Sequence, residues 1–395
     1  MKKILENAQL IKDEIVTFRR TIHQNPEFGQ NLPKTTAYVM DKLRGFGYEP
    51  KEICESCVVA TIQGKKQGKT LLLRADMDSL NIREESDCEF KSINGNMHAC
   101  GHDMHTAMLL GAAKLLKQYQ DEIEGTIKLI FQSDEEGFTG AKRMINAGVL
   151  ENPKVDAAMG LHVFSGGPTN TILYTLETGT ANCIGFRIII DGKGCHGAMP
   201  EKGVDPINIA SHIYISLQEI ISREISASES AVLTIGKFLG GDAPNVIPDN
   251  VVMEGTIRSM SKETGDFIYE RMNEIVTSTG QLFRGKARLE KISSVPPLKN
   301  DFVLTNEIAS YIKDIVGEKS VIQYKGGQGM GSEDFAYYSQ EVPSVFFMVG
   351  AGSSSENPKY GLPMHHPKVE FNEEVLVTGV AIHAYSAIMW LKNNK

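Results

Sequence analysis

The chain has 395 residues, of which 41% are hydrophobic and 23% are charged, and its formal net charge is −8. This acidic balance argues against nucleic acid or an anionic membrane surface as a partner, because both would repel it. No apolar run approaches the ~20 residues that a membrane span needs, so we expect no membrane partner.

The length and the cysteines narrow the architecture further. A chain of this size is long for one hydrophobic core, and two domains are the better expectation. Six cysteines are too few for a disulfide framework in so long a chain. Residues 1–14 are charged and amphipathic, without the apolar stretch of a signal peptide. We therefore expect reduced thiols and a cytoplasmic protein.

The first part of the chain alternates between helical and strand patterns. Apolar residues at helical spacing indicate helices, and short apolar runs indicate strands. In chain order the expected elements are helices at 5–24 and 35–46, strands at 58–62 and 70–73, a helix at 107–116, a strand at 125–132, a helix at 140–147 and a strand at 157–160. The first two strands are expected to pair around turn residues 64–68. Such alternation indicates an α/β sheet with helices on both faces, where ligands bind at the strand ends.

The pattern changes after residue 180. Strands and helices then follow in the order β-α-β-β-α-β, at 183–191, 205–221, 231–238, 250–259, 262–278 and 287–293. This order is typical of a ferredoxin-like module. The α/β pattern resumes with a helix at 303–316, a strand at 344–349 and a helix at 375–391. We therefore predict an inserted domain at 181–293 within a main domain formed by 1–180 and 294–395.

The stretch Met97–His105 concentrates potential metal ligands just before the helix at 107–116. It contains Cys100, His102 and two further histidines, and it mixes nitrogen and sulfur donors with the oxygen of Asp103. This mixture suits zinc, manganese, cobalt or nickel. A polar helix N-terminus is the alternative, but chance rarely clusters so many ligands.

Asp134, Glu135 and Glu136 are three adjacent acids at the end of the strand 125–132. Their mutual repulsion is unfavourable unless cations offset it. Of two neighbouring glutamates, one can coordinate a metal while the other acts as a base toward water. A solvated acidic turn is equally plausible for this segment taken alone, and less so beside Cys100 and His102.

Three more histidines could complete a metal site. His162 follows the strand at 157–160, and the pair His365 and His366 lies in a loop before Pro367. A lone histidine of either kind is more often a core or surface residue. Together with the residues above, they supply the ligands that two close cations need.

The inserted domain carries three further candidates. His196 lies in a glycine-rich loop and could stabilise a developing oxyanion, or simply belong to a turn. Arg258 at a strand end could hold a substrate carboxylate, or be a surface arginine. Asn245 lies in the same domain.

Taken in order, these motifs resemble one family. Met97-His-Ala-Cys-Gly-His-Asp-Met-His-Thr106, Phe131-Gln-Ser-Asp-Glu-Glu-Gly137, Gly194-Cys-His-Gly-Ala-Met-Pro200, Met330-Gly-Ser-Glu-Asp-Phe335 and Met364-His-His-Pro367 are similar to the metallo-amidohydrolases that include hippurate hydrolases, N-acyl-amino-acid deacylases and plant auxin-conjugate hydrolases. The resemblance extends over nearly the whole chain. It implies a dinuclear-metal catalytic domain with a mixed sheet, and an inserted lid domain that often forms a homodimer.

The resemblance also implies roles for individual residues. The metal ligands would be Cys100, His102, Glu136, His162 and His365, with His366 as the fallback for the last. Glu135 would be the general base and His196 would help to hold the oxyanion, either within its own chain or across a dimer interface. Asn245 and Arg258 would contact substrate, and Asp76 and Asp103 would orient ligands.

The implied reaction is hydrolysis of an N-acyl amino acid to a carboxylic acid and a free amino acid, with two divalent cations as cofactors and a small-molecule substrate as the only other partner. A metal-dependent dipeptidase or aminopeptidase on the same core is the first alternative. A non-catalytic small-ligand-binding relative is the second, although a binding protein needs no general base. A cysteine peptidase using Cys100 is a weaker possibility.

Overall fold

A computed structural model describes residues 2–326 and 329–395. The chain divides into two compact units, each with its own core. Unit 1 comprises Met1–Gly179, Lys299–Gly326 and Tyr337–Lys395, and unit 2 comprises Thr180–Leu298 with Gly327–Ala336. The second, short segment of unit 2 was not anticipated from the sequence.

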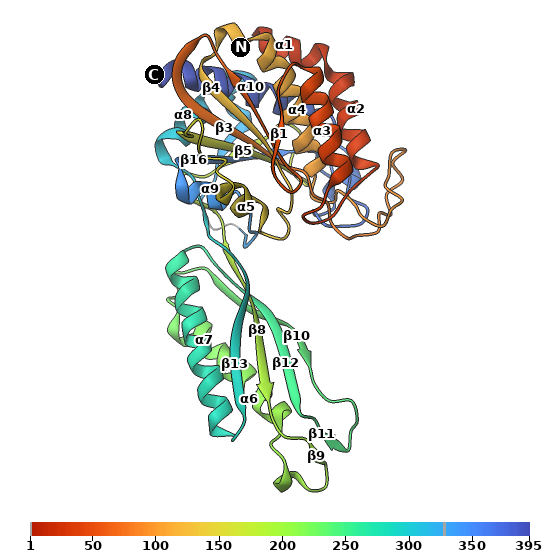
Figure 1. The fold of residues 1–395 in the computed structure, drawn as a ribbon, viewed down its shortest axis with the longest axis vertical. Coiled ribbons are helices and arrows are strands. Elements are labelled where there is room, and N and C mark those ends of the chain that lie inside the picture. Colours follow the sequence, from red (N-terminus) through yellow and green to blue (C-terminus); the bar gives the residue numbers. More distant parts are fainter. Residues whose placement is uncertain (1, 327–328) are drawn as a thin grey trace. The chain divides into compact units, whose positions relative to one another are not determined.

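Unit 1 is built on a mixed eight-stranded sheet (Figure 1). In spatial order its strands are β1 (Lys51–Cys54), β2 (Cys57–Gln63), β4 (Glu124–Gln132), β3 (Lys66–Asp76), β5 (Ala157–Phe164), β16 (Ser344–Gly350), β6 (Ile172–Tyr174) and β15 (Val321–Gln323). Strands β4, β3, β5 and β16 run parallel to one another. Their carboxyl ends therefore meet at one edge of the sheet. The predicted mixed α/β fold is confirmed.

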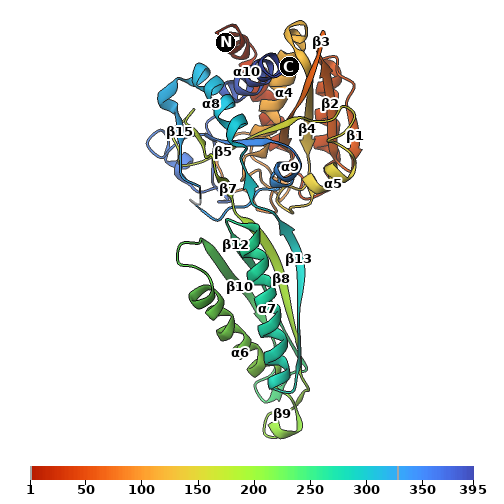
Figure 2. The same ribbon diagram turned by 90° about the vertical axis from the view of Figure 1, so that its left-hand side faces the viewer.

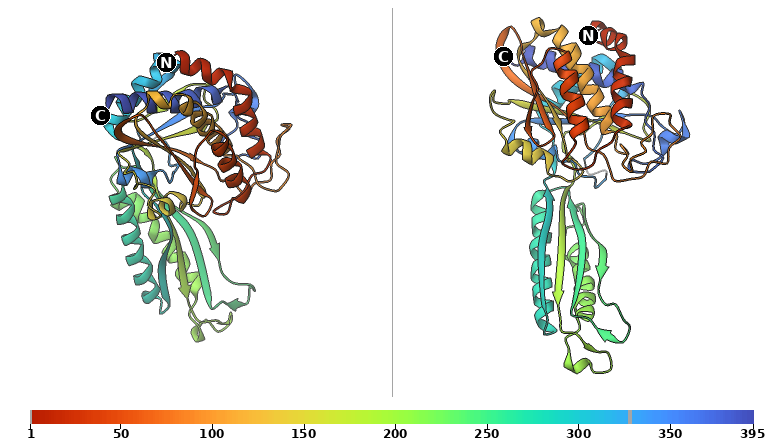
Figure 3. Two further views of the ribbon diagram at one scale, coloured as in Figure 1. Left: turned by 45° about the horizontal axis from the view of Figure 1, so that its top comes forward. Right: turned by 45° about the vertical axis from the view of Figure 1, so that its right-hand side comes forward.

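Helices cover both faces of this sheet. α4 and α10 pack together on one face, beside α1, α2 and α3, and α5 packs on the other (Figures 1 and 2). Figure 3 shows the orange α4 among the red N-terminal helices. The helices of unit 1 are α1 (Lys2–Leu10), α2 (Lys12–His23), α3 (Pro33–Gly45), α4 (His102–Gln118), α5 (Gly140–Asn146), α8 (Phe302–Val316), α9 (Ala336–Glu341) and α10 (Val375–Asn393).

Two predictions about this unit were wrong in detail. β2 and β3 do not pair with each other, because β4 lies between them, antiparallel to β2 and parallel to β3. β2 instead forms its hairpin with β1, a strand that sequence analysis missed. The single helix expected at 5–24 is broken at Ile11, which separates α1 from α2.

α10 corrects a third expectation. By length and composition this helix could cross a membrane, whereas the sequence analysis found no apolar run of that length. However, 89% of the apolar window is buried inside the protein, where α10 packs against α4, α8 and α1. Core packing therefore accounts for its composition.

Unit 2 is a four-stranded antiparallel sheet with two helices, in the strand order β10-β12-β8-β13. Both helices begin at residues whose side chains accept backbone hydrogen bonds, Asp205 for α6 and Ser261 for α7. The chain order and the sheet order are those of the ferredoxin-like module predicted from the sequence. Its elements are β8 (Asn182–Asp191), α6 (Pro206–Glu219), β10 (Ala231–Leu239), β12 (Asn250–Ser259), α7 (Lys262–Leu282) and β13 (Lys286–Val295).

Candidate metal centre

The parallel strand ends of unit 1 bring the predicted ligands together. Cys100 and His102 lie at the start of α4, and His162 lies near the end of β5. The Cys100 sulfur is 3.6 Å from His162 Nε2. Gly101 between the first two has a left-handed φ of 90°, and a Cβ there would meet the Val163 side chain at 2.4 Å. Glycine is therefore required for this turn.

His102 is held so that one ring nitrogen faces the site. Its Nδ1 donates a hydrogen bond to the Asp78 carbonyl oxygen at 2.9 Å, so Nε2 is the atom that carries the lone pair in the neutral, metal-binding form of the ring. Nε2 is buried and has no hydrogen-bond partner within the described parts of the chain. A buried acceptor without a partner is costly unless a ligand completes it, as a cation would here.

His162 is oriented by the same principle. Its Nδ1 donates to the Val163 carbonyl oxygen at 2.5 Å, so Nε2 faces Cys100. Burial and the neighbouring His105 keep the pKa of His162 well below its usual value. The ring is therefore neutral at physiological pH, which is the form that binds a metal.

The Glu135–Glu136 segment follows β4 and is organised by one carboxylate. Asp78 accepts hydrogen bonds from the backbone N–H groups of Glu135 and Glu136, each at 3.1 Å. Asp134, just before them, has a left-handed φ of 59° that turns the chain at the end of the strand. Asp78 thereby places both glutamates at the edge where α4 begins.

Of the histidine pair, His365 lies beside the other candidates. Its Nε2 lies 3.3 Å from the Cys100 sulfur and 3.3 Å from Glu136 Oε1. His366 instead accepts a hydrogen bond from the Lys368 N–H through its Nδ1, at 3.1 Å. His365 is thus the member of the pair that joins the other candidates.

Three overlapping groups contain the predicted ligands and Glu135, and the donor atoms of each group lie within 4.8 Å of one another. They are Cys100 with His102 and His162, Cys100 with Glu136 and His365, and His102 with Glu135 and Glu136. Because Cys100 and His102 are each shared, the groups define neighbouring positions for more than one cation. The nitrogen, sulfur and oxygen donors fit zinc, manganese, cobalt or nickel.

The electrostatics of the site also favour cations. The pKa values of Glu136 and of the buried Asp76 lie below their usual range, so two carboxylates bring negative charge to one place. Hydrogen bonds that the protonated His365 ring donates to Cys100 and Glu136 raise its pKa to about 10. Burial lowers the pKa of His102, but the carboxylate of Asp76 outweighs it and holds this pKa well above the usual value. Positive charge is therefore stabilised at the position that a metal ion would take.

Asp76 and Asp103 were both expected to orient metal ligands, but only Asp76 lies beside one of the predicted ligands. Asp76 accepts a hydrogen bond from His105 Nδ1 at 2.5 Å and lies 3.7 Å from His102 Nε2. Asp103 does not support a predicted ligand, since it accepts hydrogen bonds from Arg19 and His23. That expectation for Asp103 was wrong because successive residues at a helix start point to different sides.

Sequence analysis assigned no role to two supporting residues, Asp78 and His105, although His105 belongs to the ligand-rich stretch Met97–His105. Asp78 organises the glutamates and His102, as described above. His105 Nε2 accepts a hydrogen bond from the Val163 N–H at 2.8 Å and so fixes the end of β5 beside His162. The signal for Asp78 was its position two residues after Asp76, just beyond the end of β3.

The candidates of the inserted domain all lie in unit 2. His196 is exposed and pairs with Val246 in the small ribbon of β9 (Cys195–His196) and β11 (Val246–Ile247). The Asn245 carbonyl oxygen accepts a hydrogen bond from the Gly197 N–H at 2.8 Å. His196 and Asn245 are therefore neighbours at one end of the unit.

Arg258 lies at the other end of unit 2. Its Nη1 donates to the Met330 carbonyl oxygen at 2.6 Å and to Ser332 Oγ at 3.0 Å. It is eight positions from Asn250 along β12, a distance of about 26 Å at ~3.3 Å per residue. Since Asn250 begins β12 just after the β9–β11 ribbon, unit 2 separates Arg258 from His196.

The fold and this donor set define a class of protein. The model of peptidase family M20/M25/M40 matches residues 72–388, and the chain belongs to this family. It is a hydrolase, with amidohydrolases and deacetylases among its relatives.

Individual relatives cover nearly the full chain. The chain is 38% identical to the IAA-amino acid hydrolase ILR1-like 4 of Arabidopsis thaliana, over 96% of this chain and 86% of the relative. It is 35% identical to the N-acetyl-L-cysteine deacetylase of Bacillus subtilis, over 98% and 91%. The solved structure of the Bacillus subtilis YXEP protein, a dinuclear metal binding peptidase from the M20 family, matches with a TM-score of 0.81 and 30% identity, over 97% of this chain and 99% of that one.

Proposed function

We propose that this enzyme hydrolyses the amide bond of N-acyl amino acids. The observation that carries the proposal is the convergence of five metal-ligand candidates beside Glu135 at the strand ends of unit 1. The names of relatives over 30% identical support the substrate class, since they act on IAA-amino acid conjugates and on N-acetyl-L-cysteine.

The residues that would hold two divalent cations are Cys100, His102, Glu136, His162 and His365. When bound, the cations lower the pKa of water toward neutrality and polarise the scissile carbonyl. We assign manganese, zinc, cobalt or nickel from the donor types, without a choice among them.

Glu135 is the proposed general base. Its Oε2 lies 3.9 Å from His102 Nε2, so its carboxylate faces the ligand group. It would take a proton from the attacking water and later deliver that proton to the leaving amine. The backbone hydrogen bonds to Asp78 hold Glu135 in place for both transfers. Cys100 serves as a ligand in this scheme, and no covalent enzyme intermediate is needed.

The second unit is proposed to complete the site from another subunit. His196 would donate a hydrogen bond to the oxyanion, and Arg258 and Asn245 would contact the substrate. Within one chain Arg258 is about 26 Å from the ribbon that carries His196 and Asn245, as estimated above. A small substrate cannot bridge that distance. If all three act on one substrate, two copies of unit 2 must contribute, which supports a homodimer.

Unit 2 offers an apolar edge for such a dimer. β10 is an edge strand whose Phe238 and Leu239 are exposed. Helix α6, which packs beside β12, exposes Tyr214 and Ile215. An unpaired edge strand with exposed apolar side chains is suited to pairing with a second copy.

The test is a substrate screen on the metal-free protein refilled separately with manganese, zinc, cobalt or nickel. N-acetyl, N-benzoyl and longer N-acyl amino acids are compared with free-amine dipeptides by kcat/KM. We expect N-acyl amino acids to be preferred. A preference for dipeptides would replace the proposal with a peptidase activity, and no turnover with any metal would indicate a binding protein.

Cytoplasmic residence is also part of the proposal. All six cysteines are free thiols, which suits a reducing compartment. Fractionation of the source cells with an antibody against the chain tests this directly.

A further inference from the structure

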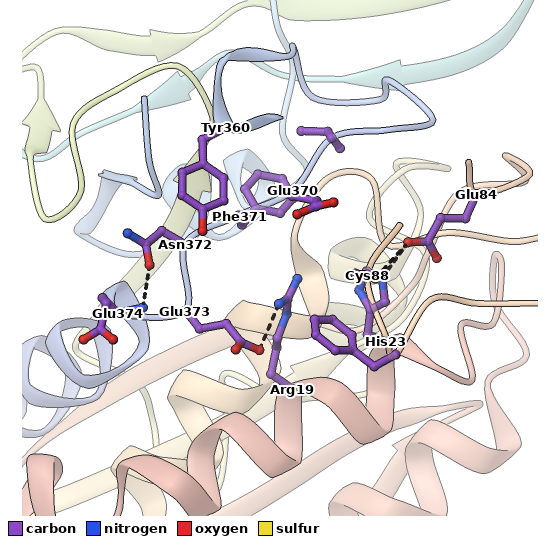
Figure 4. Close-up of a pocket in the computed structure, with 12 residues that line it drawn as sticks. Arg19, His23, Glu84, Cys88, Tyr360, Glu370, Phe371, Asn372, Glu373 and Glu374 are labelled. Atoms are coloured by element: carbon purple, nitrogen blue, oxygen red, sulfur yellow. Dashed lines mark hydrogen bonds and ion pairs between the residues drawn. The ribbon is translucent and has the colours of Figure 1, made fainter. Parts of the chain in front are cut away.

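A second cluster of metal-binding side chains lies in unit 1, in the wall of a cavity of about 250 Å³. It comprises His23 at the end of α2, with Glu84 and Cys88 from the segment that follows β3 (Figure 4). His23 Nε2 lies 3.2 Å from Glu84 Oε1, and the Cys88 sulfur lies 3.6 Å from the same oxygen. Three different donor atoms therefore face one point.

We propose that this cluster, the His23 site, binds a third divalent cation, and that the cation is zinc. Imidazole, carboxylate and thiolate are all zinc ligands, and the thiolate disfavours magnesium and calcium. Three protein ligands leave a fourth position open toward the cavity for water or a small ligand. None of the three residues belongs to the metal centre described above.

The orientation of the His23 ring is fixed by a carboxylate at Nδ1, the ring nitrogen that does not face Glu84 and Cys88. Its Nδ1 is 2.9 Å from Asp103 Oδ2, and Arg19 Nε donates to the same oxygen at 2.8 Å. A carboxylate on the far nitrogen fixes the ring orientation of a ligating histidine and makes it a stronger ligand. Phe90 packs edge-on against the ring at 5.3 Å between centroids. Nε2 is thereby fixed toward Glu84 and Cys88.

Glu84 and Cys88 are held in the same way. Glu84 Oε2 accepts a hydrogen bond from the Ser92 N–H at 2.6 Å, which turns Oε1 toward His23. Ser86 Oγ donates to Glu84 Oε1 at 2.5 Å and contacts the Cys88 sulfur at 3.2 Å. Such hydrogen bonds from surrounding groups restrict both side chains before a cation arrives.

The cavity gives a cation a route to these ligands. Figure 4 shows His23, Cys88 and Glu84 together at one side of the pocket, with Glu370 across from them. The charge of Arg19 is offset by Glu373, whose Oε1 lies 3.0 Å from Arg19 Nη1. The lining is therefore acidic enough to attract a divalent cation.

Zinc stoichiometry tests the proposal without reference to turnover. The full chain is freed of metal by chelation, titrated with zinc and separated from unbound ions before elemental analysis. We expect three ions per chain, and two for Cys88→Ser. Cys54→Ser is the matched control, since Cys54 is also a half-buried thiol of unit 1, and it should retain three. Two ions in the parent chain, or three in Cys88→Ser, would overturn the proposal.

Cobalt spectroscopy separates this site from the main centre. Thiolate ligation of cobalt gives a charge-transfer absorption, and Cys100 contributes one such thiolate in the proposed function. The band should persist in Cys100→Ser and disappear in Cys88→Ser/Cys100→Ser. Its loss in Cys100→Ser alone would show that the His23 site is only a hydrogen-bonded cluster.

A second variant, Glu84→Gln, keeps the proposal testable if Cys88→Ser does not fold. Glu84→Gln keeps the thiol and the shape of the side chain, and it should weaken binding of the third zinc ion at least ~10-fold. Unchanged affinity in a folded Glu84→Gln protein would also contradict the proposal.

Discussion

His365 Nε2 lies 3.3 Å from the Cys100 sulfur, although 265 positions separate the two residues. The backbone fixes this contact, because the His365 N–H donates to the Ala99 carbonyl oxygen at 2.9 Å. A left-handed φ of 69° at His365 turns the loop at this point. A loop that follows β16 thus reaches the candidate site, whose other proposed ligands lie just after β4, on β5 and at the start of α4.

His365→Ala should weaken the binding of one cation. A direct ligand should matter more than an outer hydrogen-bond partner, whose loss costs ~10–100-fold, so we expect at least a 100-fold loss of affinity for that ion. Metal titration by calorimetry measures the effect. His366→Ala is the control and should bind both ions like the parent; equal effects of the two variants would contradict the assignment.

Glu135→Gln should reduce kcat by about 10²–10⁴-fold while both cations stay bound, because an amide cannot accept the proton of water. Steady-state kinetics and elemental analysis of the same sample give the two quantities. Glu122→Gln, an exposed change in a surface turn, is the matched control. Near-normal turnover of Glu135→Gln with its metals in place would falsify the role of this residue.

Asp78→Asn should disturb the position of the glutamates without removing a ligand. One of the two backbone N–H groups would then face an amide N–H₂ group in place of an acceptor oxygen. We expect a loss of about 1–3 kcal/mol in the free energy of unfolding, measured by urea denaturation, and a kcat at least tenfold lower. An unchanged kcat would mean that Asp78 only stabilises the fold.

The buried His23 should make stability depend on alkaline pH in the metal-free protein. Burial lowers the pKa of His23, but Asp103, and after it the hydrogen bonds with Cys88 and Glu84, outweigh burial and raise this pKa to about 10 from an ordinary value of 6.5. The stabilising effect is therefore complete below pH 6.5 and is lost as the pH rises toward 10.

His23→Gln isolates this effect. The free energy of unfolding of the parent should fall by a few kcal/mol more than that of the variant between pH 6.5 and 10, at about 1.4 kcal/mol per pKa unit. Denaturant unfolding with chelator at several pH values measures both curves. Parallel curves would show that His23 is uncharged in the folded state.

Ile215→Glu should convert the proposed dimer to a monomer. Ile215 on α6 is 67% exposed, and a carboxylate at a buried interface is costly unless it is paired. Sedimentation velocity reports the mass. Leu282→Glu is the control, since Leu282 ends α7 and is 75% exposed. A parent chain that sediments as a monomer would refute the dimer.

The sequence predicted the fold class well because period and order are local signals. The alternation of patterns in unit 1 and the β-α-β-β-α-β order of unit 2 can be read from neighbouring residues. The pairing of strands cannot be read from neighbouring residues, so the position of β4 between β2 and β3 was not predicted. The break at Ile11 was also hidden, because apolar spacing continues across it.

The site divides in the same way. The ligand candidates were recognisable by residue type and by resemblance to a family. The resemblance already favoured His365 over His366. The roles of Asp78 and His105 depend on side-chain directions that no spacing reveals. The contacts of Asp103 with Arg19 and His23 join segments about 80 positions apart, so only the folded chain shows them.

The position of α10 bears on how the chain folds during synthesis. The four strands and two helices of the ferredoxin-like module lie in the continuous segment Thr180–Leu298. This segment is therefore synthesised completely, and can fold, before α10 has been made. The folding of unit 1 cannot finish until the end of synthesis, because the apolar side of α4 stays exposed until α10 has been made and packs on it. The nascent amidohydrolase core is therefore the aggregation-prone part of the molecule and the part that a chaperone would need to shield.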